Sequence, residues 1–370
     1  MDEIFSAGEK FHGYIIEKPL GKGGLGAVYL VRHELMELPF ALKILYPRVA
    51  SESPEYVRRF VREAKIASKI RNANLVAVHD VGYDTAKGIY FLIMDYVRGS
   101  DLRTAIALGG AMDPREAVRI VASVARALAA GEPFGVVHRD IKPENIMLED
   151  DGTVKLVDLG VAKIKGTDSL RTMPKTIFGT PNYISPEQAM DSSAVDSRAD
   201  IYSLGVVLYE LLCGRRPYEC DTPTEVIKVL LSPKPLPDIR AANPAVPQKL
   251  SMLLQLMLAK APEKRIACAS QLLDTLVRFG YGDVARENAV STVATASYGA
   301  GKPDEKPFDY AGLSAAPAND TLSFKTQDRE ISEFVEKLKA RKRRNKLLTT
   351  LAGVLGVIAA LGLIIAILTW

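Results

Sequence analysis

The order of apolar and polar residues predicts strands near the start of the chain, followed by a helix. The stretch YIIEKPLGKGGLGAVYLVRH alternates apolar and polar residues, stops at a group of glycines and then resumes. This pattern predicts a strand, a glycine turn and a second strand. PFALKIL, from Pro39 to Leu45, predicts a buried strand, and the helical period of SPEYVRRFVREAKIASKI predicts a helix with Ser51 or Ser53 near its start.

The last 24 residues, from Leu347 to Trp370, carry no charge. A helix of this length covers roughly 36 Å, enough for a hydrocarbon core of about 30 Å. The basic run KLKARKRRNK directly precedes it, and the positive-inside rule places that flank in the cytoplasm. We therefore expect a single-pass membrane anchor with the rest of the chain in the cytoplasm. A buried soluble helix is the alternative.

Small residues recur at every fourth position of this apolar stretch, at Ala352, Gly356 and Ala360. Two helices can approach closely along such a face. The pattern therefore suits a homodimer through the anchor, although small residues are common in membrane spans in any case.

Composition and charge narrow the classes of function. With 48% hydrophobic and 25% charged positions, the 370 residues can form a sizeable core. The formal charge is +4, but residues 331–346 alone hold an excess of +5, so the remainder carries −1 and offers no basic field for nucleic acid. Three cysteines without CxxC spacing indicate neither a disulfide framework nor a zinc site. Residues 290–328 are rich in Ala, Ser, Gly, Pro and Asp and predict a linker.

Gly21, Gly23 and Gly26 follow the spacing G-x-G-x-x-G. A dinucleotide-binding turn has the same spacing but opens a helix, whereas AVYLV, which follows here, is typical of a strand. A hairpin tip without Cβ atoms can direct backbone N–H groups at phosphate oxygens. A plain glycine-rich hairpin without a ligand is the alternative.

Lys43 is the single cation in the apolar strand PFALKIL. A lysine in such a place either reaches the surface at a sheet edge or has a partner, because buried lysines without one are rare. Glu63, on the predicted helix, is the acid best placed to meet it. Glu63 is otherwise expected to lie on a solvated helix face and to pair with a nearby Arg or Lys.

The stretch VVHRDIKPENIMLEDDGTVKLVDLG, from Val136 to Gly160, places four polar groups between apolar runs. HRDIKPEN and DLG resemble the catalytic loop and the metal-binding motif of the Hanks-type (eukaryotic-like) bacterial Ser/Thr protein kinases. The resemblance extends from Tyr14 to about Arg278, and Lys142 gives the Ser/Thr rather than the tyrosine pattern. It implies an α+β, two-lobed protein kinase fold, with a β-rich N-lobe and a helical C-lobe, here followed by one C-terminal transmembrane helix.

The resemblance also implies the roles of individual residues. Asp140 would accept the proton of the substrate hydroxyl, and Lys142 would steady the γ-phosphate. Lys43, paired with Glu63, would hold the α- and β-phosphates of ATP. The remaining assignments are the metal ligands Asn145 and Asp158, for Mg²⁺ or Mn²⁺, and the further ATP contacts Leu20, Gly21, Lys22, Gly23, Gly24, Gly26, Val28, Ala41, Met94, Asp95, Val97 and Asp101. Among these, Met94 would be the gatekeeper, Asp95 and Val97 would bind adenine through their backbone groups, and Asp101 would lie near the ribose.

Further motifs fit the same family in order along the chain. FGTPNYISPEQ is similar to the end of the activation segment, and its Glu187 would pair with Arg265. Asp200 would brace the catalytic loop. Leu159 replaces the usual Phe of the metal motif, and Asn72 and Ala73 stand where the family often has His-Pro, so His79 is interpreted as a packing or surface residue. Thr172 and Thr176 are the hypothetical autophosphorylation sites, whose phosphates Arg139 would bind.

These patterns predict five segments. They are an N-terminal lead (1–13), a kinase domain (14–278, with the N-lobe ending at about Arg98), a flexible linker (279–330), a basic juxtamembrane segment (331–346) and a transmembrane helix (347–370). The expected function is a membrane-tethered Ser/Thr protein kinase that acts on proteins and lies at the lipid bilayer, with no nucleic-acid partner. A catalytically weak ATP-binding membrane scaffold is one alternative. A soluble kinase whose tail is buried against its own domain is another.

Overall fold

The computed structural model describes residues 4–157, 182–190, 195–220 and 222–286. Asp158, Thr172 and Thr176 therefore lie outside the described residues. The same holds for residues 287–370, which include most of the predicted linker and the whole predicted transmembrane helix. Within the ranges that are described, no helix combines the length and the apolar character needed to cross a membrane.

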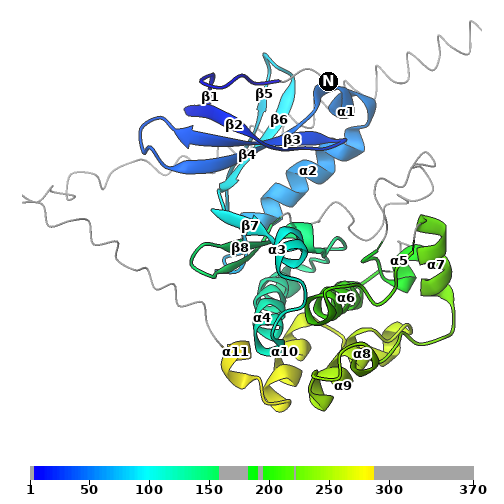
Figure 1. Ribbon diagram of the computed structural model, residues 1–370. Coiled ribbons are helices and arrows are strands. Elements are labelled where there is room, and N and C mark those ends of the chain that lie inside the picture. The colour runs from blue at the N-terminus through cyan, green and yellow to red at the C-terminus, as the bar shows by residue number, and fades with distance from the viewer. Residues whose placement is uncertain (1–3, 158–181, 191–194, 221, 287–370) are drawn as a thin grey trace, which may run out of the picture. The chain divides into compact units, whose positions relative to one another are not determined.

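A six-stranded antiparallel sheet forms the N-terminal part, with strand order β1-β2-β3-β4-β6-β5 (Figure 1). Its strands are β1 (Lys10–Phe11), β2 (Tyr14–Lys22), β3 (Gly26–His33), β4 (Pro39–Leu45), β5 (Val78–Asp84) and β6 (Ile89–Asp95). Two helices, α1 (Pro47–Glu52) and α2 (Pro54–Ala67), follow β4 in the chain. The structure confirms the predicted strand pair around the glycines, the strand from Pro39 to Leu45 and the helix that begins after Ser53.

The register of the sheet places four of the predicted ATP contacts, Val28, Ala41, Lys43 and Met94, on one face. Val28 pairs with Lys43, and Lys43 pairs with Leu92, so these three stand side by side across β3, β4 and β6. Ala41 pairs with Met94 two positions along, and residues two apart in a strand point to the same face. The opposite face is buried and consists of Tyr29, Val31, Leu42, Ile44, Phe91 and Ile93.

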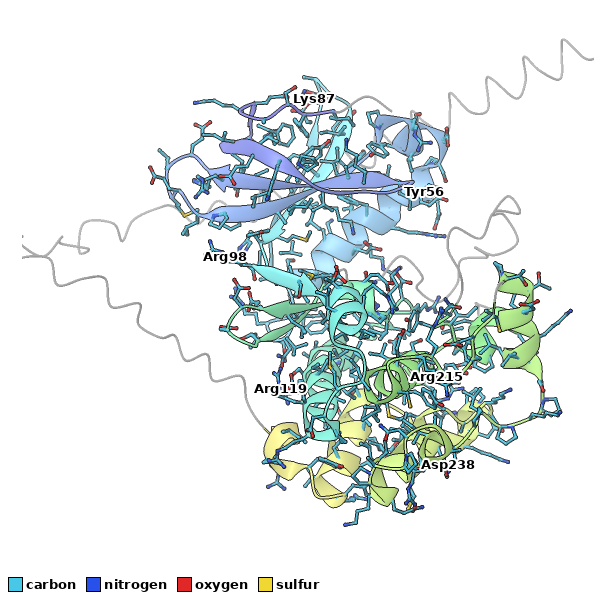
Figure 2. All side chains as sticks on the ribbon, viewed as in Figure 1. Tyr56, Lys87, Arg98, Arg119, Arg215 and Asp238 are labelled. Carbon is cyan, nitrogen blue, oxygen red and sulfur yellow. The ribbon has the colours of Figure 1, made fainter. Side chains whose placement is uncertain are left out.

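The N-terminal segment packs on this sheet. Phe5 is buried, with its ring 4.8 Å from that of Phe11 and 5.4 Å from that of Tyr29, edge-on in both cases. The ammonium group of Lys87, labelled in Figure 2, lies 4.9 Å over the Phe5 ring. Part of the predicted lead (1–13) is therefore folded. Such aromatic contacts contribute about 0.5–1.5 kcal/mol each beyond the area they bury.

Among the described residues, the C-terminal part is helical apart from one small sheet. This antiparallel sheet consists of β7 (Gly99–Asp101), β8 (Ile146–Glu149) and β9 (Val154–Leu156). The α-helices are α3 (Leu102–Gly109), α4 (Pro114–Gly131), α5 (Pro186–Met190), α6 (Arg198–Cys213), α7 (Pro223–Leu231), α8 (Ile239–Ala242), α9 (Gln248–Met257), α10 (Ala269–Arg278) and α11 (Gly282–Arg286). Short 3₁₀ turns are η1 (Glu132–Phe134), η2 (Pro143–Asn145) and η5 (Pro262–Lys264).

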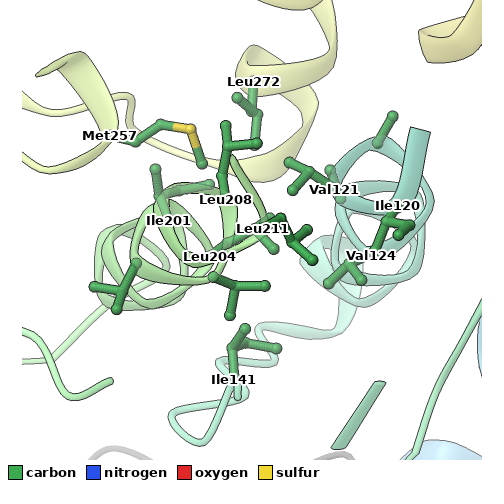
Figure 3. Close-up of a cluster of buried hydrophobic side chains, with 14 of the residues drawn as sticks. Ile120, Val121, Val124, Ile141, Ile201, Leu204, Leu208, Leu211, Met257 and Leu272 are labelled. Atoms are coloured by element: carbon green, nitrogen blue, oxygen red, sulfur yellow. The ribbon is translucent and has the colours of Figure 1, made fainter. Parts of the chain in front are cut away.

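Helix α6 is the central element of this helical part. Every residue from Ala199 to Leu212 is buried, as expected for a helix with apolar residues on all sides, and the buried residues include the carboxylates of Asp200 and Glu210. Its side chains pack against α4 and α9, and Figure 3 shows the shared cluster, which includes Val121, Leu208 and Met257. Ile141 of the predicted catalytic loop belongs to the same cluster and lies at its edge below Leu204 (Figure 3), so the core holds this loop directly.

The folded part continues past Arg278. Val284 and Ala285 of α11 are buried, and the Arg126 side chain donates a hydrogen bond to the Val284 carbonyl at 2.8 Å. These residues fall within the segment 279–330 that was predicted to be a flexible linker, and they correct its start. The pattern failed here because a five-residue helix is too short to show a helical period.

Candidate active site

The predicted catalytic loop forms a hydrogen-bonded cluster. The Asp140 carboxylate oxygen Oδ2 accepts hydrogen bonds from Lys142 Nζ at 2.8 Å and from Asn145 Nδ2 at 3.1 Å. Asn145 Nδ2 also donates to the Asp140 carbonyl at 2.8 Å. The side chain of Asp140 is 46% exposed, so the hydroxyl group of a molecule in solution can reach it. The structure thus brings together three of the predicted site residues in one place.

A buried carboxylate fixes the loop from behind. Asp200, near the start of α6, accepts hydrogen bonds from the backbone N–H of His138 at 2.7 Å and of Arg139 at 2.6 Å. Complete burial raises the pKa of Asp200 to about 7, while the two backbone donors act in the opposite direction. The predicted bracing role of Asp200 therefore has a geometric basis in these two hydrogen bonds.

Arg139 has an unusual backbone conformation. Its φ is 63°, in the left-handed region, which costs a residue with a Cβ about 1–3 kcal/mol and persists only where its surroundings enforce it. Asp200 holds its N–H, and the Gln188 side chain donates to its carbonyl at 3.0 Å. Gln188 ends the motif ISPEQ, but its contact with the loop is not predicted by the sequence, because the two are 49 residues apart.

The Arg139 guanidinium is itself buried. Its Nη2 donates to the Val195 carbonyl at 3.1 Å, whereas its Nε meets no acceptor among the described residues. Burial lowers the pKa of Arg139, and the nearby Asp200 opposes this change. A buried donor without an acceptor is costly, so this group is suited to an anion from outside the described residues.

Lys43, Glu63 and Met94 line a single cavity of about 390 Å³, which includes space open to solvent. They come from β4, α2 and β6 respectively. The other lining residues are apolar: Ala64, Ala67, Leu75, Val76, Val78, Leu92 and Leu156. The cavity therefore joins one cation and one carboxylate to an apolar wall, a combination typical of ligand sites. The pairing of Lys43 with Glu63 stays a prediction.

The glycine-rich hairpin is closed at its tip. Gly23 N–H donates to the Gly26 carbonyl at 2.8 Å, and a Cβ on Gly26 would lie only 1.8 Å from the Ile44 carbonyl oxygen. The register also shifts between Pro19 and Gly21, and such irregularities increase the local twist. The hairpin prediction is confirmed and the strand-to-helix turn is excluded, because β3 follows the glycines. The phosphate contacts predicted for this hairpin stay predictions.

Polar side chains brace the predicted hinge after β6. Asp95 Oδ1 lies 2.6 Å from His79 Nε2, and Asp95 Oδ2 accepts the Ala77 N–H at 3.1 Å. His79 is thus a surface residue with a defined partner. Asp101 caps α3, because its carboxylate accepts the backbone N–H three residues later at 2.8 Å. The backbone contacts of Asp95 and Val97 with adenine remain predictions, as does the ribose contact of Asp101.

The predicted ion pair between Glu187 and Arg265 is present. Arg265 Nη1 lies 2.7 Å from Glu187 Oε1, and the side chain of Arg265 is 0% exposed while that of Glu187 is 14% exposed. The guanidinium also donates to the carbonyls of Arg198 and Ala259 and lies 5.0 Å from the centroid of the Tyr202 ring. This pair fixes α5 to the helical core.

Comparisons with known proteins agree with this geometry. The family described as the protein kinase domain matches residues 14–276. A probable serine/threonine-protein kinase of Clostridium acetobutylicum is 36% identical over 263 residues, which make up 71% of this chain and 39% of that protein. The serine/threonine-protein kinase PknB of Mycobacterium tuberculosis is 36% identical over 273 residues, or 73% and 43% of the two chains. PrkC of Bacillus subtilis, also a serine/threonine-protein kinase, is 34% identical over 266 residues, or 72% and 40%.

A solved structure shows the same fold. The PknI kinase domain of Mycobacterium tuberculosis has a TM-score of 0.58 and 29% sequence identity, and the similarity covers 74% of this chain and 99% of that one. The curated relatives are longer, and this chain spans less than half of the length of each of the three named above. The likeness is therefore to the kinase domains of these proteins.

Proposed function

Since this chain belongs to the protein kinase domain family and its folded part is a protein-serine/threonine kinase domain, we propose that the whole protein transfers the γ-phosphate of ATP to Ser and Thr hydroxyls of proteins. The observation that carries the proposal is the cluster of Asp140, Lys142 and Asn145. It holds an accessible carboxylate beside a cation. That is the arrangement phosphoryl transfer needs, because the reaction depends on positioning and on charge stabilisation.

In this mechanism the substrate hydroxyl donates its proton to the Asp140 carboxylate while its oxygen forms a bond to the γ-phosphorus. The bond from that phosphorus to the bridging oxygen breaks, and ADP leaves. Lys142 Nζ, 2.8 Å from Asp140 Oδ2, places positive charge where the transferred group carries negative charge. Asp200 and Gln188 act indirectly: their hydrogen bonds to the loop backbone keep it in the conformation from which Asp140 projects.

The donor set fits a hard divalent cation. Asn145 directs its amide nitrogen to Asp140, which turns its amide oxygen the other way, and oxygen is the ligand that Mg²⁺ prefers. Mg²⁺ or Mn²⁺ would be held by this oxygen and by Asp158, which lies outside the described residues. The bound ion would neutralise charge on the phosphates.

The proposal is tested by incubating the full chain with ATP and Mg²⁺ and a mixture of unrelated proteins, and by locating new phosphates with mass spectrometry. We expect phosphoserine and phosphothreonine, and no new phosphate when the metal is chelated. Formation of ADP without a phosphorylated side chain would favour a different ATP-dependent activity. ATP binding without turnover would favour the membrane scaffold.

Regulation by autophosphorylation is part of the proposal. The buried Arg139 guanidinium has an Nε donor without an acceptor among the described residues, and a phosphate on Thr172 or Thr176 would supply one. Such a contact would order the segment that carries the two threonines. Phosphopeptide mapping of active enzyme checks this, and active enzyme unmodified at both threonines would refute it.

We also propose that the kinase is tethered to a membrane through residues 347–370. The support is the sequence: an uncharged stretch of 24 residues behind a basic run. Association of two chains through Ala352, Gly356 and Ala360 would bring two kinase domains together and favour phosphorylation of one chain by the other. Fractionation of cells separates the tethered kinase from a soluble one.

A further inference from the structure

Arg103 joins four separate segments of the chain. It lies on α3, and its Nε is 3.1 Å from Glu144 Oε1 in η2. Its Nη1 is 2.8 Å from Glu210 Oε1 on α6, and its Nη2 donates to the hydroxyl of Tyr183, which precedes α5. The Tyr183 hydroxyl in turn donates to Glu210 Oε2 at 2.6 Å. We call these four residues, Arg103, Glu144, Tyr183 and Glu210, the Arg103 cluster.

The Arg103 cluster contains two carboxylates and one cation. Glu210 is 5% exposed, so its charge needs a partner, whereas Glu144 is 45% exposed and faces solvent. Burial acts to lower the pKa of Arg103, but its hydrogen bonds with Glu210 and Glu144 raise it overall. Burial and the hydrogen bond to Glu210 raise the pKa of Tyr183, which keeps its hydroxyl a donor. Without the guanidinium, the site would be an acidic pocket with one buried and one accessible carboxylate.

The Arg103 cluster lies next to the proposed reaction centre. Glu144 precedes Asn145, whose side chain contacts the Asp140 carboxylate at 3.1 Å. A peptide that brings a hydroxyl to Asp140 in an extended conformation advances about 3.3 Å per residue. Side chains one to three residues from the accepting Ser or Thr therefore pass within reach of Glu144.

From this placement we infer that Arg103 is a specificity-determining residue: it occupies, from within the chain, an acidic site that would otherwise receive an Arg or Lys of the protein substrate. This inference rests on the proposed kinase function. It identifies the substrates as peptides whose phosphorylation does not depend on a basic residue beside the acceptor. It also predicts that removal of the internal cation creates such a dependence.

The test compares kcat/KM of the full chain for a set of Ser peptides that carry one Arg, scanned from four residues before the Ser to four residues after it, with an all-Ala reference. The wild type should accept the Arg and Ala peptides about equally. Arg103→Leu should prefer Arg about tenfold at one or two positions, because a charge-assisted pair with a buried carboxylate contributes at least that factor. Arg103→Gln should show a smaller preference of the same kind. Its amide can still donate a hydrogen bond to Glu210, so this variant tests the inference if Arg103→Leu does not fold.

Two further variants make the result specific. Arg103→Leu combined with Glu210→Gln removes the buried charge and should abolish the new preference. Arg119→Leu is the matched control, because Arg119, labelled in Figure 2, also pairs with a glutamate, Glu116, but on α4. This control should behave as the wild type does.

Three results would overturn the inference. A wild type that already prefers Arg about tenfold would show that the acidic site is open, and folded, active Arg103 variants without any new preference would show that it is not a substrate site. If the wild type transferred no phosphate to any peptide or protein, the proposed kinase function would fail, and this inference with it. The phosphorylation rate of the all-Ala peptide distinguishes this last case from the first two.

Discussion

Asp200 shows how one buried side chain determines the geometry of the catalytic loop. Its two carboxylate oxygens accept two successive backbone N–H groups at 2.6 and 2.7 Å. These contacts stabilise the left-handed conformation of Arg139, the residue directly before Asp140. An amide at this position would have one acceptor and one donor group, so it could satisfy only one of the two N–H groups.

We therefore expect Asp200→Asn to lower the free energy of unfolding by about 1–3 kcal/mol, the cost of a buried donor left without a partner. The kcat for phosphoryl transfer should fall more than the KM for ATP changes, because the affected loop carries Asp140. Urea unfolding and steady-state kinetics measure both effects. Asp196→Asn, an exposed change just before α6, is the control and should alter stability by less than about 0.5 kcal/mol. Wild-type stability and kcat in Asp200→Asn would contradict the role assigned to Asp200.

At the scale of elements, the helical part depends on a buried ion pair as well as on apolar packing. α6 packs against α4 and α9, while the ion pair between Glu187 and Arg265 fixes α5 to this core. Because Arg265 is fully buried, loss of its partner would leave a buried charge without a counter-charge.

Glu187→Gln should lower the free energy of unfolding by about 3–5 kcal/mol, the usual cost of breaking a buried pair from one side. Glu116→Gln removes the same charge from a partly exposed pair with Arg119 and should cost about 0–1 kcal/mol. Chemical denaturation of the two variants side by side gives the comparison. Equal losses would mean that burial of the Glu187–Arg265 pair has no energetic consequence.

The sequence predicted those elements whose pattern is local. β2, β3 and β4 have alternating or continuous apolar residues, and the loop around Asp140 has a motif. The packing of Phe5 was missed, because a two-residue strand such as β1 has no pattern and the contact depends on Lys87 and Tyr29, far away in sequence. The Arg103 cluster was missed for the same reason: its partners are 41 to 107 residues away and meet only in the folded chain.

At the scale of the whole molecule, the proposal separates a folded kinase domain from a membrane anchor. The described residues end at Arg286, and residues 287–370 include both the basic run and the uncharged stretch. The sequence alone supports the anchor, because a helix over 24 uncharged residues matches the thickness of a bilayer.

The full chain should remain in the membrane pellet after an alkaline carbonate wash, and a variant that ends at Lys346 should move to the soluble fraction. A full-length variant with Leu355 and Ile358 replaced by Arg controls for the shortened chain. It should also be released, since each charge at the centre of a span costs about 2.5–3.5 kcal/mol. A full chain found in the soluble fraction would favour a tail that is buried against the kinase domain.

The most direct measurement is the initial rate at which the full chain incorporates label from γ-labelled ATP and Mg²⁺ into protein Ser and Thr, compared with its Asp140→Asn variant. The variant removes the proton acceptor and should lose about a hundredfold or more of the rate. Asp151→Asn makes the same chemical change at an exposed turn residue and should leave the rate unchanged. Equal incorporation by the wild type and Asp140→Asn would contradict catalysis by this loop, and absence of label in both, with ATP still bound, would contradict the kinase itself.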